Sequence, residues 1–101
     1  MVKKPLTVVW DNEAKAQLRK AYNYIKKDSL QSAEKVKKEI AQIAKDLIKN
    51  PQFYPPDKYR HNNDGSFRAY ELHHYRIAYH VGKEQITILR VRHTKMEPKA
   101  H

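Results

Sequence analysis

Residues 75–93 read YRIAYHVGKEQITILRVRH, and this stretch decides the fold. Apolar and polar residues alternate from Tyr75 to Val81, which is typical of a β-strand with one buried face. The tripeptide Gly82-Lys83-Glu84 predicts a turn, and the β-branched run from Gln85 to His93 predicts another strand. The short connection makes the pair antiparallel. The apolar centre of the second strand predicts burial on both of its faces.

Alternation also divides the side chains of residues 75–81 between the two faces of the sheet. One face holds Tyr75, Ile77, Tyr79 and Val81, and the other holds Arg76, Ala78 and His80. We expect the bulky face to be covered and the basic face to remain partly open.

The preceding residues predict one more strand of the same meander and an irregular connection. Phe67–Leu72 predicts the strand, and the prolines within 51–65, followed by Asn62-Asn63-Asp64-Gly65, predict an irregular segment with a turn. The adjacent histidines His73 and His74 fall in the tight turn between two predicted strands. Neighbouring residues of a strand point to opposite faces, so this pair predicts no metal site.

The first half of the chain predicts a short strand and two helices. Leu6–Trp10 is rich in β-branched and aromatic residues, as strands are. Apolar residues then recur at helical spacing within about 12–27 and again from Ala33 to Leu47, and Asn50-Pro51 ends the second helix. The predicted fold class is α+β in the order β-α-α-β-β-β. A helical hairpin covers one face of a mostly antiparallel sheet, in a single domain over 1–101.

Composition excludes several classes of protein. The chain has 101 residues, a formal net charge of +10 and no cysteine, so it forms no disulfide and no cysteine-ligated metal site. No apolar run is long enough to span a membrane, and the apolar N-terminal stretch is too short for a signal peptide. Two glycines in the whole chain leave no phosphate-cradling loop. We therefore expect a cytoplasmic protein with no cofactor, no metal, no membrane partner and an acidic partner.

The type of positive charge differs between the two halves. Residues 1–50 hold eleven lysines and one arginine, whereas residues 51–101 hold five arginines and all six histidines. Arginine suits bidentate phosphate binding, so the second half carries the predicted working surface. We expect Arg76 and His80 to meet Arg68, Arg90, Arg92 and His93 on the open face. The alternative is that these cations form surface salt bridges with Glu71, Glu84 and Asp64.

Three pieces of the sequence together resemble the RelE/ParE superfamily of type II toxins. They are the helical hairpin from Tyr24-Ile25 to Asn50-Pro51, the strand Tyr75–Val81, and the strand end Ile88–His93. The resemblance runs from about Leu6 to Pro98. It implies the toxin of a type II toxin–antitoxin, plasmid stabilisation-like module, in possible hetero-oligomeric complex with a cognate antitoxin.

The resemblance leaves two targets open. ParE-like members poison DNA gyrase, and RelE-like members are endoribonucleases that cleave mRNA on the ribosome. On the ribonuclease alternative, the resemblance assigns catalysis to Arg76, His93 and Arg68. In either branch the target-binding residues are Arg68, Arg76, His80, Arg90, Arg92, His93 and Lys95. The chain lacks the tyrosine that such ribonucleases often carry near the C-terminus, and the hairpin favours the ParE-like branch. A non-toxic RNA- or DNA-binding module is the further alternative.

Overall fold

A four-stranded sheet forms the centre of the computed structural model, which describes residues 6–96. Most of the predicted polar tail, residues 97–101, lies outside the described residues. The helices and strands follow the predicted order: β1 (Thr7–Trp10), α1 (Asn12–Lys26), α2 (Leu30–Asp46), β2 (Phe67–Leu72), β3 (Tyr75–Val81) and β4 (Gln85–His93), with a 3₁₀ turn at Thr94–Met96. The strands lie in the order β1-β4-β3-β2, and β1 runs parallel to β4 while the other pairs are antiparallel.

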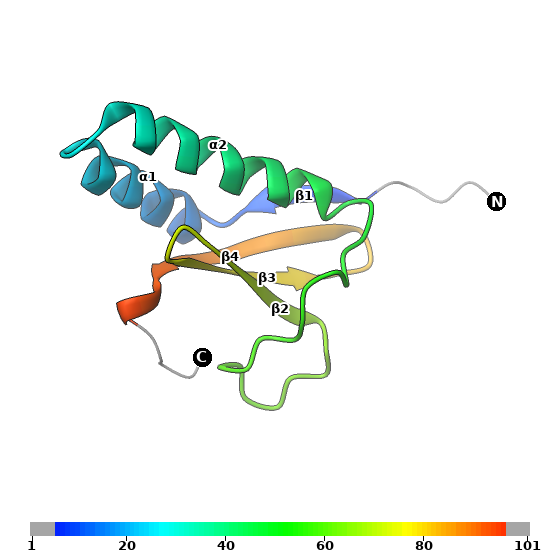
Figure 1. The fold of residues 1–101 in the computed structure, drawn as a ribbon. Helices are drawn as coiled ribbons and strands as arrows, with labels where there is room; N and C mark the ends of the chain where they lie inside the picture. Colours follow the sequence, from blue (N-terminus) through cyan, green and yellow to red (C-terminus); the bar gives the residue numbers. More distant parts are fainter. Residues whose placement is uncertain (1–5, 97–101) are drawn as a thin grey trace.

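The two helices form a hairpin on one side of the sheet (Figure 1). Only three residues separate α1 from α2, and the Ser29 hydroxyl caps α2 by accepting a hydrogen bond from the Ser32 amide at 3.1 Å. The apolar stripe predicted for α2 faces the core, and its residues Val36, Ile40 and Leu47 are buried. The predicted α+β fold is confirmed.

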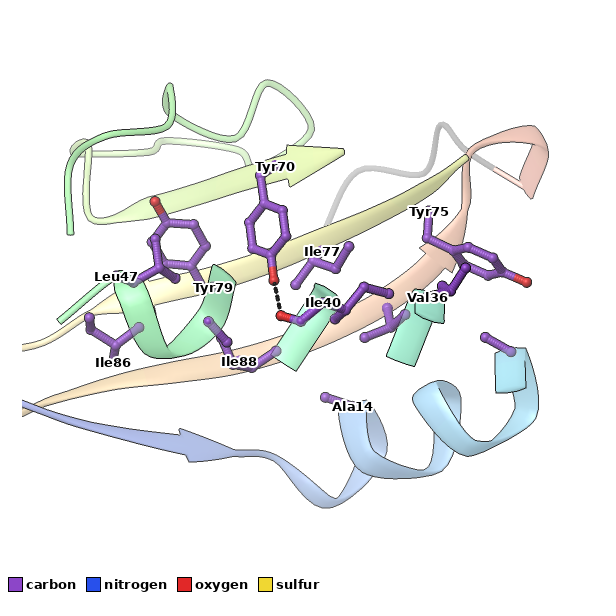
Figure 2. Packing of buried hydrophobic residues seen from close by; sticks show 13 residues of the cluster. Ala14, Val36, Ile40, Leu47, Tyr70, Tyr75, Ile77, Tyr79, Ile86 and Ile88 are labelled. Atoms are coloured by element: carbon purple, nitrogen blue, oxygen red, sulfur yellow. Dashed lines mark hydrogen bonds between the residues drawn. The ribbon is translucent and has the colours of Figure 1, made fainter. Parts of the chain in front are cut away.

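Tyrosines of the sheet fill much of the space beneath α2. Figure 2 shows Tyr70, Ile77 and Tyr79 pointing from the sheet toward this helix. The Tyr70 hydroxyl donates to the Ile40 carbonyl at 3.1 Å, and the Tyr79 hydroxyl donates to the Pro51 carbonyl at 2.9 Å. Burial raises the pKa of Tyr79 to about 12 and raises that of Tyr70 further. Each ring thus contributes apolar area while its polar end is satisfied.

A bulge in β4 decides which of its side chains face the helices. The register with β3 shifts between Ala78 and Tyr79, and Leu89 is the extra residue on β4. Ile88 and Val91 therefore share the helix-facing side although they are three residues apart. The expectation that β4 is buried on both faces was wrong, because the bulge and not two-sided burial explains its apolar run.

The segment between α2 and β2 runs along the outer edge of the sheet. Pro56 forms an isolated bridge with Arg68, the Asp57 amide donates to the Phe67 carbonyl at 2.8 Å, and the Ala69 amide donates to the Pro55 carbonyl at 3.4 Å. The segment Pro55–Asp57 thus covers half of the β2 edge and delivers Asp57 to the face of the sheet that the helices leave uncovered.

Candidate functional site

The uncovered face of the sheet, which we call the open face, carries arginines from β3 and β4. Arg76 lies directly opposite Arg92, and Arg90 lies opposite Ala78. Residues that face each other across a ladder point to the same side, so all three arginines share this face. His80 belongs to it as well, two pairs beyond Ala78 on the same side. The predicted grouping of Arg76, His80, Arg90 and Arg92 matches this register.

The Arg76 side chain forms ion pairs within the fold. Its guanidinium pairs with Asp57 and with Glu71, each at 2.9 Å, and lies 4.8 Å from the centre of the Tyr59 ring. The side chains of Arg76 and Asp57 are only 10% and 1% exposed. Burial lowers the pKa of Arg76, but the hydrogen bonds and charges of Asp57 and Glu71 outweigh that effect and raise the pKa overall. Arg76 therefore stays protonated, its charge is balanced by two carboxylates, and it holds Asp57 in place.

Arg90 and Arg92 differ from Arg76 in their charge pairing within the described residues. None of the ion pairs formed within residues 6–96 includes either one. The Nε atom of each is buried and has no hydrogen-bond partner. Both are half-buried and two residues apart on one strand face, so their guanidinium groups can serve one anion or two neighbouring anions.

A cluster of aromatic rings and cations extends the open face at the start of β2. The Phe67 ring lies 4.5 Å from the His80 ring, and the Arg60 guanidinium lies 3.8 Å from the Phe67 ring centre. The sequence interpretation did not include Arg60, Phe67 or Tyr59 in the site. The alternation of Phe67, Ala69 and Glu71 could have placed Phe67 on this face, but Arg60 and Tyr59 come from an irregular segment whose path has no periodic signal.

Of the salt bridges proposed as the alternative, the one with Glu71 forms. Asp64 instead accepts hydrogen bonds from the amide and hydroxyl of Ser66, which hold its pKa below the usual range. Glu84 takes part in none of the ion pairs in the described part of the chain. The open face is thus paired at Arg76 and unpaired at Arg90 and Arg92.

Arg68 does not lie on the open face, and the expectation that it joins Arg76 there was wrong. It lies opposite Tyr79, on the helix-facing side, because it has the same parity along β2 as Tyr70 and Leu72. Its guanidinium donates to the carbonyls of Gly65 at 2.9 Å and Tyr54 at 2.7 Å. Arg68 therefore holds the segment before β2 in place.

His93 is also separated from Arg76, contrary to the expectation. It lies opposite Tyr75 at the helix-facing side of β4, and the two rings are 5.2 Å apart. Lys95 follows in the 3₁₀ turn, and its amide donates to Nδ1 of His93 at 3.1 Å. The bulge at Leu89 reverses the alternation along β4, so Arg90 and Arg92 lie on the open face while Val91 and His93 lie on the helix-facing side.

His93 and Lys95 line a cavity of about 440 Å³ between α1 and β4, which we call the edge pocket. β1 ends at Trp10, opposite Ile88, so the last residues of β4 have no strand on that side. Gln17 of α1 lies there instead and accepts a hydrogen bond from the Val91 amide at 2.7 Å. The pocket is lined by Gln17, Lys20, Ala21, Tyr24, Tyr75, Val91, Arg92, His93 and Lys95.

The sequence of this chain matches a known protein family. The family of ParE toxins of the type II toxin–antitoxin system parDE matches residues 8–98. The chain belongs to this family. The predicted resemblance to the RelE/ParE superfamily is thereby confirmed. No curated protein matches this ParE-family chain in sequence.

Three solved structures show the same fold as this ParE-family protein. The chromosomal ParDE toxin–antitoxin system of P. aeruginosa aligns with a TM-score of 0.68 and 21% identity, over 88% of this chain and 96% of the other. The RelBE2 toxin–antitoxin complex of Mycobacterium tuberculosis aligns with a TM-score of 0.61 and 22% identity, over 88% and 98%. The YoeB dimer of Staphylococcus aureus aligns with a TM-score of 0.56 and 19% identity, over 87% and 95%.

The described part of this ParE-family protein offers little to a metal ion. No three His, Asp or Glu side chains within residues 6–96 are grouped so that they could hold one. His73 and His74 form the two-residue turn between β2 and β3, both with positive φ, and His73 pairs with Glu39 of α2. No helix of the described residues is long and apolar enough to cross a membrane.

Proposed function

We propose that this ParE-family protein is the toxin of a type II toxin–antitoxin pair and inhibits growth by poisoning DNA gyrase in the cytoplasm. The match to the ParE family over residues 8–98 carries this proposal. A cognate antitoxin is the expected partner, since two of the structurally similar proteins are toxin–antitoxin systems. On this proposal the open face binds the target, and no bond of a nucleic acid is cut by the toxin itself.

The positions of the candidate catalytic residues favour gyrase over mRNA. Attack of a ribose 2′-hydroxyl on its own phosphate needs a base, an acid and a cation within reach of one phosphate. Arg76 is on the open face and is held by two carboxylates, whereas Arg68 and His93 lie on the helix-facing side. These three residues therefore do not converge on one phosphate, which argues against the ribonuclease arrangement taken from the resemblance.

Arg90 and Arg92 are the residues best suited to bind the target. Neither forms an ion pair within residues 6–96, and His80 and Phe67 extend the same face with aromatic rings. Such a face fits an acidic protein surface or the phosphates of DNA held by gyrase. Arg76 contributes by anchoring Asp57 and Tyr59 beside these arginines.

The test is induction of the toxin in bacteria with readouts for both targets. We expect growth arrest, gyrase-trapped DNA breaks and intact mRNA. Replacement of Arg90 and Arg92 by alanine should abolish the arrest, whereas Lys38→Ala/Lys45→Ala, which removes the same charge from the exposed side of α2, should leave it unchanged. Codon-linked mRNA cuts with intact DNA would instead establish the ribonuclease alternative. If induction causes no growth arrest, the protein is not a toxin, and the alternative of a non-toxic nucleic-acid-binding module would stand.

A further inference from the structure

The edge pocket has the size and lining of a side-chain binding site. Its volume of about 440 Å³ lies in the range of small-ligand sites, and Ala21, Tyr24, Tyr75 and Val91 give it apolar and aromatic walls. Tyr24 is 64% exposed, although a tyrosine has a large apolar area to bury. The pocket lies where β1 has stopped at Trp10 and the side chain of Gln17, in place of a strand, bonds to the edge of β4.

The charges around the edge pocket all have the same sign. Its lining includes Lys20, Arg92 and Lys95 and contains no aspartate or glutamate. Lys20 comes from α1, whereas Arg92 and Lys95 follow one another around the end of β4, so cations flank the apolar walls from two elements. Cations around an apolar centre complement a segment that presents one large apolar side chain beside carboxylates.

We propose that the edge pocket receives a large apolar side chain, aromatic or branched aliphatic, from an acidic segment of the antitoxin. This inference rests on the proposed function for the existence of that partner, and it adds the surface and the chemistry of the contact. His93 and Lys95 then bind the antitoxin, the open face remains the surface for the target, and Arg92 lies where the two surfaces meet.

An acidic peptide fits this pocket better than the other occupants. A second copy of the chain carries a net charge of +10 and would bring more positive charge to a positive rim. A nucleic acid needs cations that follow a backbone, whereas here they surround an apolar cavity. The carboxylates of a peptide meet the rim while its apolar side chain enters the cavity.

The first experiment removes the exposed aromatic wall. The probe is the small protein encoded by the reading frame adjacent to the toxin gene, and its affinity for the full-length toxin is measured by calorimetry. We expect Tyr24→Ala to weaken binding at least tenfold, because exposed tyrosines that become buried dominate interfaces. The matched control is Phe53→Ala, which removes another aromatic side chain, 68% exposed, outside the edge pocket, and should change the affinity less than twofold.

The second experiment reverses the charge of the rim. Lys20→Glu/Lys95→Glu should weaken binding of the same probe more than tenfold at 0.1 M salt, and the difference from wild type should shrink at 0.5 M salt. The control Lys38→Glu/Lys45→Glu changes the net charge equally on exposed positions of α2 and should cost less than threefold. All four lysines are exposed, so thermal unfolding should be unchanged in both variants.

The outcomes separate this inference from the proposed function. If wild type binds the probe and both pocket variants bind equally well, the edge pocket is not the antitoxin site although the toxin–antitoxin pair stands. If the variants keep their antitoxin affinity but lose growth arrest, the pocket serves the target and the inference is wrong. If wild type does not bind the probe at all, the proposed partner itself is wrong.

Discussion

The two faces of the sheet differ in how far their buried polar atoms are hydrogen-bonded. On the helix-covered face, the buried hydroxyls of Tyr70 and Tyr79 each donate to a backbone carbonyl. On the open face, the Nε atoms of Arg90 and Arg92 have no partner. Arg76 also has an unpartnered Nε, but its two terminal nitrogens pair with Asp57 and Glu71, which neutralise its charge. The comparison teaches that a residue's strand face alone does not decide its role, because the state of its hydrogen bonds and charges matters as much.

Removal of the partner of Arg76 should have the largest effect on stability. Asp57→Ala leaves a buried guanidinium with only the half-exposed Glu71, and breaking a buried ion pair costs about 3 kcal/mol. Urea denaturation measures the change in the free energy of unfolding, with Asp64→Ala as the control at a fully exposed position that also accepts local hydrogen bonds. A loss below about 1 kcal/mol for Asp57→Ala would show that Arg76 is not a structural anchor.

The covered face should respond to alkaline pH. The pKa of Tyr79 is raised from its usual 10.0 to about 12, so the unfolded chain releases this proton before the folded protein does. Stability is then complete below pH 10 and falls as pH rises from 10 to 12, by about 2 kcal/mol for this residue. Unfolding free energies at pH 9 and pH 11 should differ less in Tyr79→Phe than in wild type. Equal pH dependence in the two proteins would contradict the buried, neutral phenol.

The exposed partner of Arg76 should matter less than the buried one. Glu71 is 52% exposed, and ion pairs with exposed residues contribute about 0.5 kcal/mol. Glu71→Gln should therefore lower stability by about that amount, and the difference should disappear in 1 M salt in urea titrations. An effect as large as that of Asp57→Ala would mean that the two carboxylates act as one unit.

The unpaired arginines should have the smallest effect on stability and a large effect on function. Arg90→Ala and Arg92→Ala remove no ion pair of the described residues, so each should change the free energy of unfolding by about 0.5 kcal/mol or less. Growth arrest on induction should nevertheless fall at least tenfold in the double variant. If the double variant unfolds as easily as Asp57→Ala, the contrast between paired and unpaired arginines fails.

The sequence alone was sufficient for the order of elements and for the faces of β3. Tyr75, Ile77 and Tyr79 alternate as expected and are all buried, although Ala78 on the other face is buried as well. The same alternation also gives the side of Arg68, which has the parity of Tyr70 along β2, so the expectation that it lies on the open face conflicted with the sequence pattern itself. The position of His93 depended on the bulge at Leu89, which no turn residue signals.

The paired state of Arg76 could not be predicted either. Its partner Asp57 is nineteen residues away, in the irregular segment between α2 and β2. Hydrogen bonds to Arg68 and to the strand edge fix the path of that segment, and both depend on three-dimensional packing. The end of β1 at Trp10 was predicted, but the edge pocket also depends on how α1 and Gln17 lie beside β4, which no sequence pattern gives.

The segment Pro55–Asp57 also limits how the sheet can associate with other molecules. An outer strand with free amides and carbonyls invites another chain to add a strand, which leads to aggregation. Here that edge of β2 is bonded to a segment whose first two residues are prolines and have no amide hydrogen to donate. The part of β2 from Phe67 to Ala69 is thus not free to pair with a strand of another molecule.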